Sequence, residues 1–338
     1  MNGANEVAVL VITYNGKRHL KECFDSLLNQ TFGSFDIYLV DNASSDGSSS
    51  LVREDFPIVK IIRHERNFGF AKGYNLAVKN VSSKYVVFLN DDTKVDPRWL
   101  EELVKAISRD PKVLAAGSKI FFYNRPDIIQ HAGGKLTLIG AGIDIGFGDK
   151  DRPEYNEVKC VGMVCGGSMI IRKDLFDDLG GFDDRYFAYF EDVDVCWHGW
   201  IQGYKTLYVP SSIVYHKFGG SWGSRHSYNR LYLGIKNRFA NMIKNMSFKS
   251  LLFGVSLSLS LDSLKAISFL SKKQVKSVFS MMKAYFEVIH LFPEYLSVRV
   301  KLQAERKLSD KELFDLGLFL SLPGSIGEFK RLQRLEIG

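Results

Sequence analysis

The chain contains few cysteines, few prolines and no long uninterrupted apolar run. Its 338 residues include four cysteines and eight prolines. The cysteines have neither CxxC spacing nor a neighbouring Cys/His cluster, which argues against a disulfide framework and a zinc site. The N-terminal apolar segment has no basic stretch before it, unlike a signal peptide. Because no apolar run reaches about 18 residues, we expect no membrane-spanning helix and a cytoplasmic location.

Positive charge is concentrated in the last third of the chain. Residues 1–225 contain 27 Lys and Arg against 29 Asp and Glu, whereas residues 226–338 contain 18 against 9. This asymmetry indicates an anionic partner for the C-terminal region, either a membrane surface or nucleic acid. We expect no nucleic-acid partner, because the basic residues are interleaved with apolar helix faces.

Strand and helix patterns alternate over residues 1–110. Apolar, β-rich runs predict strands at 7–12, 36–40, 59–63 and 85–89, and amphipathic helical segments lie between them. The last of these helices is expected to open at Asp96 and Pro97. Such alternation predicts an α/β fold with parallel strands and right-handed crossovers.

The pattern changes after residue 113. Glycine-rich turns separate apolar segments as far as about 225, which predicts a mixed continuation of the sheet, and the strand signal fades beyond about 230. We therefore expect residues 1–240 to form one domain, with a nucleotide-binding half (1–110) and an acceptor half (111–240). Residues 241–338 are expected to be helical, basic and amphipathic.

Polar residues follow three of the predicted strands. The first strand ends at Thr13, Tyr14 and Asn15, the second at Asp41, and the fourth at the Asp91-Asp92 pair. Asp and Asn commonly end strands and begin turns. Three such ends in register, however, favour a site, because ligands bind at the carboxyl ends of parallel strands.

Asp91 and Asp92 are the most informative pair. Two carboxylates directly after a buried strand are unfavourable unless solvent or a cation compensates them. Mg²⁺ or Mn²⁺ shared with substrate phosphates would do so. The glycine-punctuated segment 67–75, with Lys72, could approach the same phosphates, although taken alone it could equally be an ordinary turn.

A second carboxylate group, Glu191-Asp192-Val193-Asp194, lies about a hundred residues later in an aromatic-rich stretch. A carboxylate beside aromatic surface can have a raised pKa and serve as a general base. The alternative is an acidic helix start favoured by the helix dipole. His216 follows another apparent strand and could be a metal ligand, a phosphate contact or a structural histidine.

These segments together resemble the inverting family 2 glycosyltransferases with the GT-A fold, most of all their rhamnosyltransferase-like branch. The matching segments, in order, are VITYNGKRHLKECFDSLLNQTF, LVDNASSDGS, NFGFAKGYN, FLNDDT, GGSMIIRKDLFDDLGGFDDRYFAYFEDVDVCWHGWIQGY and VYHKFGGS. They cover roughly residues 7–240.

The resemblance implies a role for individual positions. The nucleotide-sugar donor (UDP-, dTDP- or GDP-linked) would be bordered by Thr13, Tyr14, Asn15, Asp41, Asn67, Gly69, Lys72 and Asp91. Asp92 and His216 would hold Mg²⁺ or Mn²⁺, although the sequence NDDT in place of a strict D-x-D motif leaves the ligand set open. Asp192 would be the catalytic base, supported by Glu191.

The basic tail has two readings. Residues 226–300 contain 11 Lys and Arg but three Asp and Glu, mixed with apolar residues. A helix of this type can lie on an anionic bilayer, which would suit a glycan or lipid-linked acceptor at the inner face of the cell membrane. Alternatively, the tail forms a helical subdomain or a homo-oligomer interface.

Two other functions are compatible with parts of the sequence. A sugar-phosphate nucleotidylyltransferase could share the layout but should carry a Gly-rich basic loop directly after the first strand, where this chain reads TYNGKRHL. An inactive carbohydrate-binding protein would explain the aromatic residues but not two carboxylate groups.

Overall fold

The computed structural model describes residues 5–217 and 228–334, and a central ten-stranded sheet dominates that part of the chain. Its strands are β1 (Val7–Thr13), β2 (Phe35–Asp41), β3 (Lys60–Arg63), β4 (Tyr85–Asn90), β5 (Thr93–Val95), β6 (Val113–Phe122), β7 (Arg125–His131), β10 (Lys159–Cys160), β11 (Ser168–Arg172) and β12 (Lys205–His216). A separate two-stranded sheet pairs β8 (Gly134–Leu136) with β9 (Gly142–Asp144).

The main path of the sheet runs β10-β12-β6-β11-β4-β1-β2-β3. Strands β4, β1, β2 and β3 are mutually parallel, and β12 is parallel to β6, whereas β11 runs antiparallel between β4 and β6. The predicted mixed, mainly parallel sheet is confirmed. Thr13 pairs with Asp41, and Ile12 pairs with Asn90, so the carboxyl ends of β1, β2 and β4 meet at one edge.

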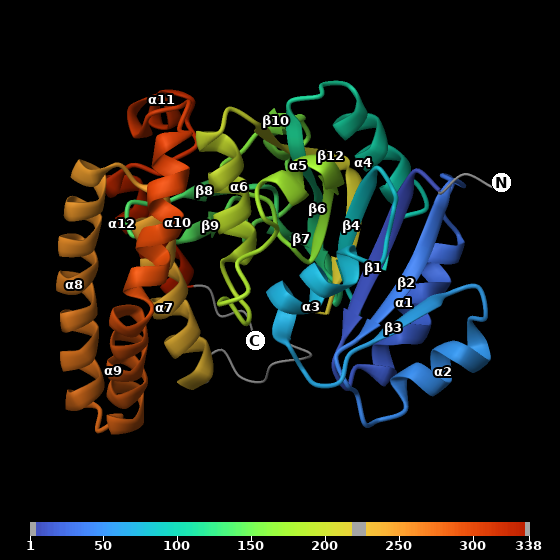
Figure 1. The fold of residues 1–338 in the computed structure, drawn as a ribbon, viewed down its shortest axis with the longest axis horizontal. Coiled ribbons are helices and arrows are strands. Elements are labelled where there is room, and N and C mark those ends of the chain that lie inside the picture. The colour runs from blue at the N-terminus through green and yellow to red at the C-terminus, as the bar shows by residue number, and fades with distance from the viewer. Residues whose placement is uncertain (1–4, 218–227, 335–338) are drawn as a thin grey trace.

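Strand β1 is buried on both faces, as its unbroken apolar sequence predicts. Alternate residues contribute to different cores: Val9 packs in the cluster that contains Phe24 and Trp99, and Leu10 packs in the cluster that contains Tyr74 and Trp197. This follows from the two-residue period of a strand. The first layer of helices therefore covers both faces of the sheet (Figure 1).

The helices of this first part are α1 (Lys17–Leu28), α2 (Ser48–Asp55), α3 (Gly69–Val78), α4 (Trp99–Ser108), α5 (Lys173–Asp178) and α6 (Glu191–Ile201), with a 3₁₀ turn at Pro153–Tyr155. The expected start of α4 at Asp96 and Pro97 was wrong by two residues, since the helix begins at Trp99 with Arg98 as its N-cap. Asp96 instead forms a turn before the helix, accepting hydrogen bonds from the backbone N–H groups of Arg98 and Trp99.

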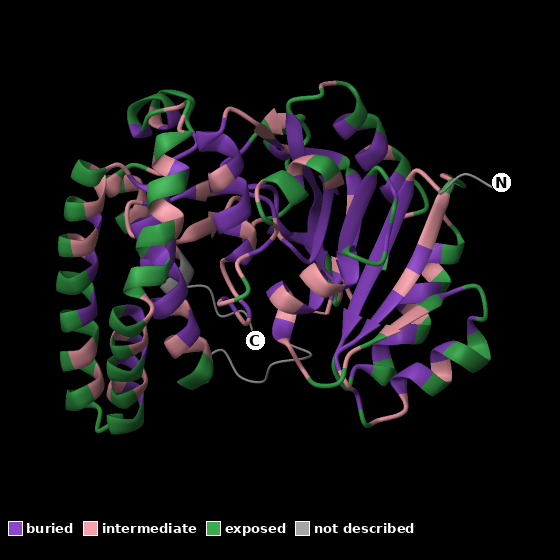
Figure 2. Ribbon diagram, viewed as in Figure 1, coloured by how far each residue is buried: buried purple, intermediate pink, exposed green. Residues whose placement is uncertain are grey.

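The C-terminal region is helical, as predicted. It comprises α7 (Tyr228–Asn245), α8 (Phe248–Ser271), α9 (Val275–His290), α10 (Phe292–Ala304), α11 (Asp310–Asp315) and α12 (Leu322–Arg334). Helix α7 contacts α6, and its Phe239 and Met242 belong to the same hydrophobic cluster as Trp197. Helices α8 and α9 lie at the far edge from the sheet (Figure 1), with much of their surface exposed (Figure 2). The domain limits at 110 and 240 stay a prediction.

Helix α8 bears on the expectation that no helix spans a membrane, which stays a prediction. It is 24 residues long, and an 18-residue window within it has a mean hydropathy of 1.3, so by length and composition alone it could cross a membrane. Serines interrupt its apolar residues, which is why no continuous apolar run was evident. Only 17% of the apolar window is buried within the protein.

Candidate active site

The first carboxylate group lies at the edge where β1, β2 and β4 end. Thr13, the last residue of β1, donates a hydrogen bond from Oγ1 to Asp91 Oδ2 over 2.5 Å. Gly16 begins the turn into α1, and a Cβ on it would lie 1.9 Å from Asp91 Oδ2. The turn therefore requires glycine at this position, and it encloses Asp91 against Thr13.

Asp92 is paired with the predicted metal ligand His216. His216 Nε2 lies 3.0 Å from Asp92 Oδ1, and His216 Nδ1 lies 2.9 Å from Gln130 Oε1 on β7. Strand β5 pairs antiparallel with the end of β12, which brings His216 opposite Thr93 and so next to Asp92. The last four residues of the matching segment VYHKFGGS, 218–221, lie outside the described residues.

The two neighbouring carboxyl groups differ in acidity. Burial and the adjacent Asp92 raise the pKa of Asp91 to about 7. Burial also acts on Asp92, but the hydrogen-bonded His216 outweighs it and lowers the pKa of Asp92 below its ordinary value. Asp92 is thus held as a carboxylate, whereas Asp91 keeps its proton up to about pH 7, and a nearby cation would favour its ionised form.

Two of the predicted donor-binding residues, Tyr14 and Asn15, follow β1 and differ in exposure and hydrogen bonding. Tyr14 is 52% exposed, and Asn15 adopts a left-handed backbone (φ 56°) while its side chain accepts a hydrogen bond from the Ser45 N–H. A hollow of about 650 Å³ begins beside Asn15 and is lined by three basic side chains and one carboxylate: Lys17, Arg18, Lys21 and Asp46, with Leu51.

Asp41 is fully buried, and its carboxylate accepts hydrogen bonds within the protein. Ser44 N donates over 2.7 Å, Arg63 Nη1 donates over 2.6 Å, and Ser49 Oγ also donates. Arg63, which sequence reasoning missed, is half exposed and lies between this carboxylate and solvent. The expected contact of Asp41 with the base stays a prediction, and Arg63 is the accessible member of the pair.

The 67–72 segment packs against the loop that precedes α6. Gly69 has a φ of +77°, and a Cβ there would lie 2.2 Å from the Phe187 carbonyl oxygen. Asn67 Oδ1 accepts the Gly69 N–H over 2.9 Å. Lys72 Nζ lies 3.8 Å from Asp184 and 5.3 Å from the Phe68 ring centre. Asn67 and Gly69 thus shape this loop, whereas Lys72 is directed to Asp184.

In the second carboxylate group the members have different environments. Asp192 Oδ2 accepts the Gly166 N–H over 2.9 Å, and its Oδ1 accepts the Val193 N–H over 2.8 Å. Asp194, two residues on, bonds instead to Lys244 (2.7 Å) and Asn245 (2.8 Å) of α7. Within the described residues, Glu191 Oε2 is buried without a hydrogen-bond partner.

These environments give the two candidate bases, Glu191 and Asp192, different protonation behaviour. Burial raises the pKa of Glu191 well above its ordinary value, which favours its neutral form. Burial also raises the pKa of Asp192, but the two backbone N–H groups oppose this by stabilising the carboxylate. Asp192 is therefore the better proton acceptor of the pair.

A short loop, residues 165–167, links the two carboxylate groups. Asn90, directly before Asp91, donates its N–H to the Gly167 carbonyl over 3.0 Å. Gly166, the residue before Gly167, donates its N–H to Asp192 Oδ2. A Cβ on Gly166 would lie 2.9 Å from the Phe70 ring and 3.4 Å from Asp192 Cβ. The loop thus connects the helix start at Asp192 to the strand end at Asn90, although about a hundred residues separate them in sequence.

His131 and Asp144 near this loop were missed from the sequence. His131 Nδ1 lies 2.7 Å from Asp144 Oδ1, and its Nε2 lies 3.2 Å from the Cys165 N–H, which it accepts in the corresponding tautomer. The segment QHAGG at the end of β7, a histidine before two glycines, was the available signal. In the sequence this segment is indistinguishable from an ordinary turn, because its contact with the 165–167 loop depends on the tertiary fold.

Helix α7 holds the segment that leads into Asp192. Tyr189 and Phe190 both have left-handed backbones (φ 72° and 68°), which is strained for bulky residues. Asn237 Nδ2 donates to the carbonyl oxygens of Ala188 (2.9 Å) and Tyr189 (2.7 Å). Asn237 is therefore a positioning residue for the start of α6.

Replacement Asn237→Leu tests this support. It removes both donors at similar volume and leaves two buried carbonyls unpaired, so we expect unfolding to become easier by about 1–3 kcal/mol. Turnover should fall about tenfold, since misplacement of a catalytic group can reduce the rate up to about 10²-fold, while nucleotide affinity stays unchanged. Urea unfolding and steady-state kinetics measure both. A variant that loses stability but keeps full turnover would remove the positioning role.

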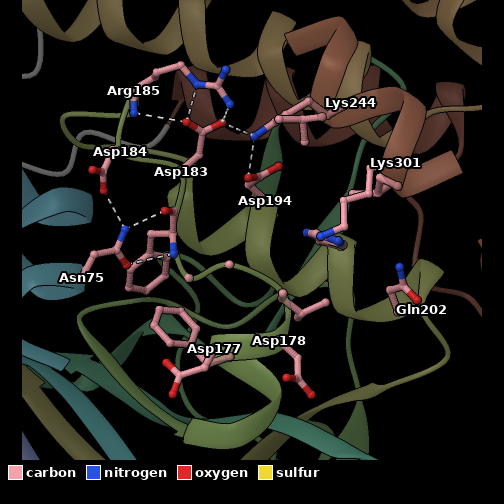
Figure 3. A pocket seen from close by; sticks show the side chains of 18 of the residues that line it. Asn75, Asp177, Asp178, Asp183, Asp184, Arg185, Asp194, Gln202, Lys244 and Lys301 are labelled. Carbon is pink, nitrogen blue, oxygen red and sulfur yellow. Dashed lines mark hydrogen bonds and ion pairs between the residues drawn. The ribbon is translucent and has the colours of Figure 1, made fainter. Parts of the chain in front are cut away.

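A further cavity lies on the other side of α6. It has a volume of about 970 Å³ and is lined by residues of α3, α5, α6 and α10 with the loop after α5 (Figure 3). Asp183 accepts hydrogen bonds there from Arg185 and Lys244, and Lys244 also contacts Asp194 (Figure 3). These neighbouring cations, above all Lys244, outweigh burial and lower the pKa of Asp183 far below its ordinary value. The network fastens α7 to α6.

His198 in this cavity predicts a pH dependence of stability. Burial lowers its pKa to about 4 from 6.5. The unfolded chain therefore binds a proton between these values that the folded chain does not, and stability is lost as pH falls from 6.5 towards 4. The loss is at most about 3 kcal/mol. In His198→Gln, the drop in melting temperature between about pH 7 and about pH 4.5 should be smaller than in the wild type. Parallel curves would contradict this.

The residues present can hold a metal ion only together with a substrate. Over residues 5–217 and 228–334, no three His, Cys, Asp or Glu side chains converge as a closed metal site. Asp92 and His216 offer one oxygen and one nitrogen donor side by side. Mg²⁺ and Mn²⁺ commonly use one or two protein carboxylates plus substrate phosphates, so this donor set fits a shared ion.

Comparisons with solved structures identify the architecture. A mannosyltransferase from Pyrobaculum calidifontis, in complex with GDP-Man and Mn²⁺, matches with a TM-score of 0.54 and 18% identity, covering 93% of this chain and 88% of that one. Staphylococcus aureus TarS 1–349 with UDP-GlcNAc matches with a TM-score of 0.56 and 15% identity, covering 89% and 92%. These likenesses confirm the GT-A fold.

Sequence comparisons identify the family. The N-acetylglucosaminyl-diphospho-decaprenol L-rhamnosyltransferase of Mycobacterium tuberculosis (strain H37Rv) is 28% identical over 240 residues, covering 64% of this chain and 77% of the relative. An uncharacterized Haemophilus influenzae glycosyltransferase is 24% identical over 308 residues, covering 84% and 93%. The profile of Glycosyl transferase family 2 matches residues 8–180, more than half of the chain. The chain therefore belongs to glycosyl transferase family 2.

Proposed function

We propose that this glycosyltransferase is metal-dependent and inverting, and that it moves a sugar from a nucleotide-diphosphate donor to an acceptor hydroxyl. The observation that carries the proposal is the 165–167 loop, which contacts Asp192 at Gly166 and the strand end before Asp91 at Gly167. One group of carboxylates can thereby serve the leaving diphosphate while the other serves the attacking hydroxyl.

Asp192 is proposed as the base. It accepts the proton of the acceptor hydroxyl as that oxygen bonds to the anomeric carbon, and the bond from this carbon to the diphosphate oxygen breaks on the opposite side. The electron pair leaves with the diphosphate, and the configuration of the anomeric carbon inverts. Its raised pKa suits this role, because a base whose pKa approaches the working pH transfers protons efficiently. Buried Glu191 supports the position of Asp192.

The donor is proposed to lie along the carboxyl edge of β1 and β2. Thr13, Tyr14 and Asn15 would border the nucleotide, with Asp41 and Arg63 towards the base, and with Asn67, Gly69 and Lys72 along the ribose and diphosphate. Asp92 and His216 would hold Mg²⁺ or Mn²⁺, and Asp91 would lie beside the ribose or the ion. A bound ion would neutralise charge that develops on the leaving diphosphate.

The acceptor is proposed to be a glycan or a lipid-linked glycan in cell-surface polysaccharide assembly, with the enzyme at the cytoplasmic side of the membrane. Similarity to the mycobacterial rhamnosyltransferase, whose name specifies a decaprenol-linked substrate, supports this class of acceptor. A homo-oligomer stays a prediction.

A donor screen tests the function. The protein is incubated with a soluble acceptor glycan and UDP-, dTDP- or GDP-sugars, with Mg²⁺ or Mn²⁺ or with a chelator, and the released nucleotide is identified. We expect nucleoside diphosphate release only with metal, and NMR of the product should show inversion at the anomeric carbon. Pyrophosphate production from a sugar phosphate and a nucleoside triphosphate would support a nucleotidylyltransferase instead. Sugar binding without turnover across the panel would support a carbohydrate-binding protein.

A further inference from the structure

Helices α8 and α9 carry an apolar outer face. On α9, the side chains of Phe279, Met282, Phe286 and Ile289 are between 60% and 73% exposed and recur at helical spacing along one stripe. On α8, Phe253, Leu264 and Ile267 are between 51% and 65% exposed. The two helices contact each other and form a hairpin at the edge of the molecule (Figure 1). We call these seven side chains the apolar outer face.

The two helices of the hairpin differ on their inner sides: the buried line of α9 includes Met281, Ala284 and Val288, whereas that of α8 is largely polar. The buried line of α8 consists of Gly254, Ser258 and Asp262. Arg238 of α7 is also buried; it donates to Ser258 over 2.9 Å and pairs with Asp262. A helix that faces water normally shows the opposite arrangement, with apolar residues inward and polar residues outward. Helix α8 therefore has the polarity of a helix whose outer side meets an apolar surrounding, and α9 continues that apolar outer side.

The exposed serine hydroxyls of α8 are hydrogen-bonded within their own helix. The hydroxyls of Ser256, Ser260 and Ser263 each donate to the backbone carbonyl four residues earlier, over 2.8–2.9 Å. Serine that bonds its own helix in this way is tolerated where water is scarce.

Basic side chains border the apolar outer face. Lys272 and Lys273 form the turn between the two helices, Lys276 begins α9, and Lys249 and Lys283 are exposed on α8 and α9. Over residues 248–290 the acidic residues are Asp262, which pairs with Arg238, and Glu287. This combination of exposed apolar side chains and flanking lysines matches an anionic lipid surface, where lysine ammonium groups meet headgroup phosphates.

We propose that the α8–α9 hairpin docks the enzyme in the plane of an anionic membrane surface, with the apolar outer face inserted below the headgroups and without spanning the bilayer. In-plane docking follows from the Arg238–Asp262 pair, because it ties the middle of α8 to α7, which itself packs on α6 of the catalytic domain. A spanning α8 would carry that pair and α7 into hydrocarbon, which is strongly unfavourable. The proposal rests on this surface alone and is independent of the reaction assigned to the carboxylates.

Vesicle flotation of the full chain tests the proposal, with no donor or acceptor present. The wild type should float with vesicles that contain phosphatidylglycerol and much less with phosphatidylcholine alone. Phe279→Ser combined with Met282→Ser and Phe286→Ser should lower the bound fraction at least about tenfold. A matched control replaces Ile58 and Val158 by Ser, since these are 70% and 56% exposed on other parts of the molecule; its flotation should equal that of the wild type.

The alternative occupant is a second copy of the chain. Three results together would show an oligomer interface: the wild type is a dimer without lipid, the triple variant is monomeric, and neither protein floats with vesicles. That outcome would overturn the proposal. Equal flotation of the triple variant and the wild type also overturns it. Circular dichroism of the triple variant establishes that it is folded, and release of nucleotide with a soluble acceptor reports separately on the catalytic site.

Insertion depth separates docking in the plane from spanning. The variants Leu259→Trp and Ile267→Trp add a fluorophore near the middle and near the end of α8. In-plane docking predicts that lipids brominated near the headgroup quench the added fluorescence of both variants. Selective quenching of Leu259→Trp by lipids brominated near the bilayer centre would show a spanning helix and would contradict the proposal.

Discussion

Asp192→Asn should lower kcat by ~10²–10⁴-fold, the range typical of general-base assistance, while nucleoside diphosphate affinity stays unchanged. The variant keeps the volume of the side chain and one acceptor oxygen but cannot take a proton from the acceptor hydroxyl. One of the N–H groups of Gly166 and Val193 loses its acceptor, so a small loss of stability accompanies the change. Nucleotide release with saturating donor gives kcat, and calorimetry with the nucleoside diphosphate gives the affinity.

Asp194→Asn provides the matched control in the same helix. Asp194 lies in a buried network with Lys244 and Asn245 and faces away from the 165–167 loop. Its replacement should lower the melting temperature, because Lys244 loses one of its two carboxylate partners, and should change kcat by no more than a few-fold below that temperature. Full turnover in Asp192→Asn, or an equal loss of turnover in both variants, would remove Asp192 from the role of base.

Asp92→Asn should abolish most of the stimulation by Mn²⁺ or Mg²⁺. The amide is a weaker ligand than the carboxylate that His216 holds ionised. A metal contributes several kcal/mol to stabilising the charge that develops on a leaving diphosphate, so kcat should fall by ~10²–10³-fold. Metal titrations of nucleotide release should also show a half-saturating concentration raised at least about tenfold.

Asp96→Asn is the control for this second variant. Asp96 lies four residues further along but accepts the Arg98 N–H at the turn before α4, away from His216. Its metal titration should match that of the wild type. If Asp92→Asn also retains the wild-type titration, the ion is held elsewhere or is not used.

The first carboxylate group was predictable because its geometry is local to a parallel sheet. Uniformly apolar strands at 7–12 and 85–89 could only be buried neighbours, so Thr13, Asp41 and Asp91 had to end at one edge, as the register shows. The sequence could not show that Asp41 would be fully enclosed by Ser44, Ser49 and Arg63. Such enclosure depends on how the following loop folds back.

The second carboxylate group shows where sequence reasoning is limited. Helical spacing places Glu191 and Asp194 on one face, yet the choice between Asp192 and its neighbours depends on partners far along the chain. Gly166 lies 26 residues before Asp192, and Lys244 lies 50 residues after Asp194. The contact of His131 with the Cys165 N–H depends on the same long-range packing, because 34 residues separate the two positions.

The C-terminal region was predictable as helical and basic, but its exposure was not. Met282, Phe286 and Ile289 recur at helical spacing, which ordinarily marks the side that packs on a core. In the structure these residues are exposed, and Met281, Ala284 and Val288 are buried instead. Helix α9 is apolar on both sides, so periodicity alone could not decide which side faces the protein.

Anomalous diffraction from a crystal soaked with Mn²⁺ and the product nucleoside diphosphate tests the central claim most directly, namely that Asp92 serves the leaving diphosphate in the same site where Asp192 serves the attacking hydroxyl. We predict a manganese peak within bonding distance of Asp92 and His216, with diphosphate oxygens completing its ligands and the terminal phosphate turned towards the 165–167 loop. A nucleotide bound elsewhere, or manganese that contacts neither Asp92 nor His216, would contradict the account.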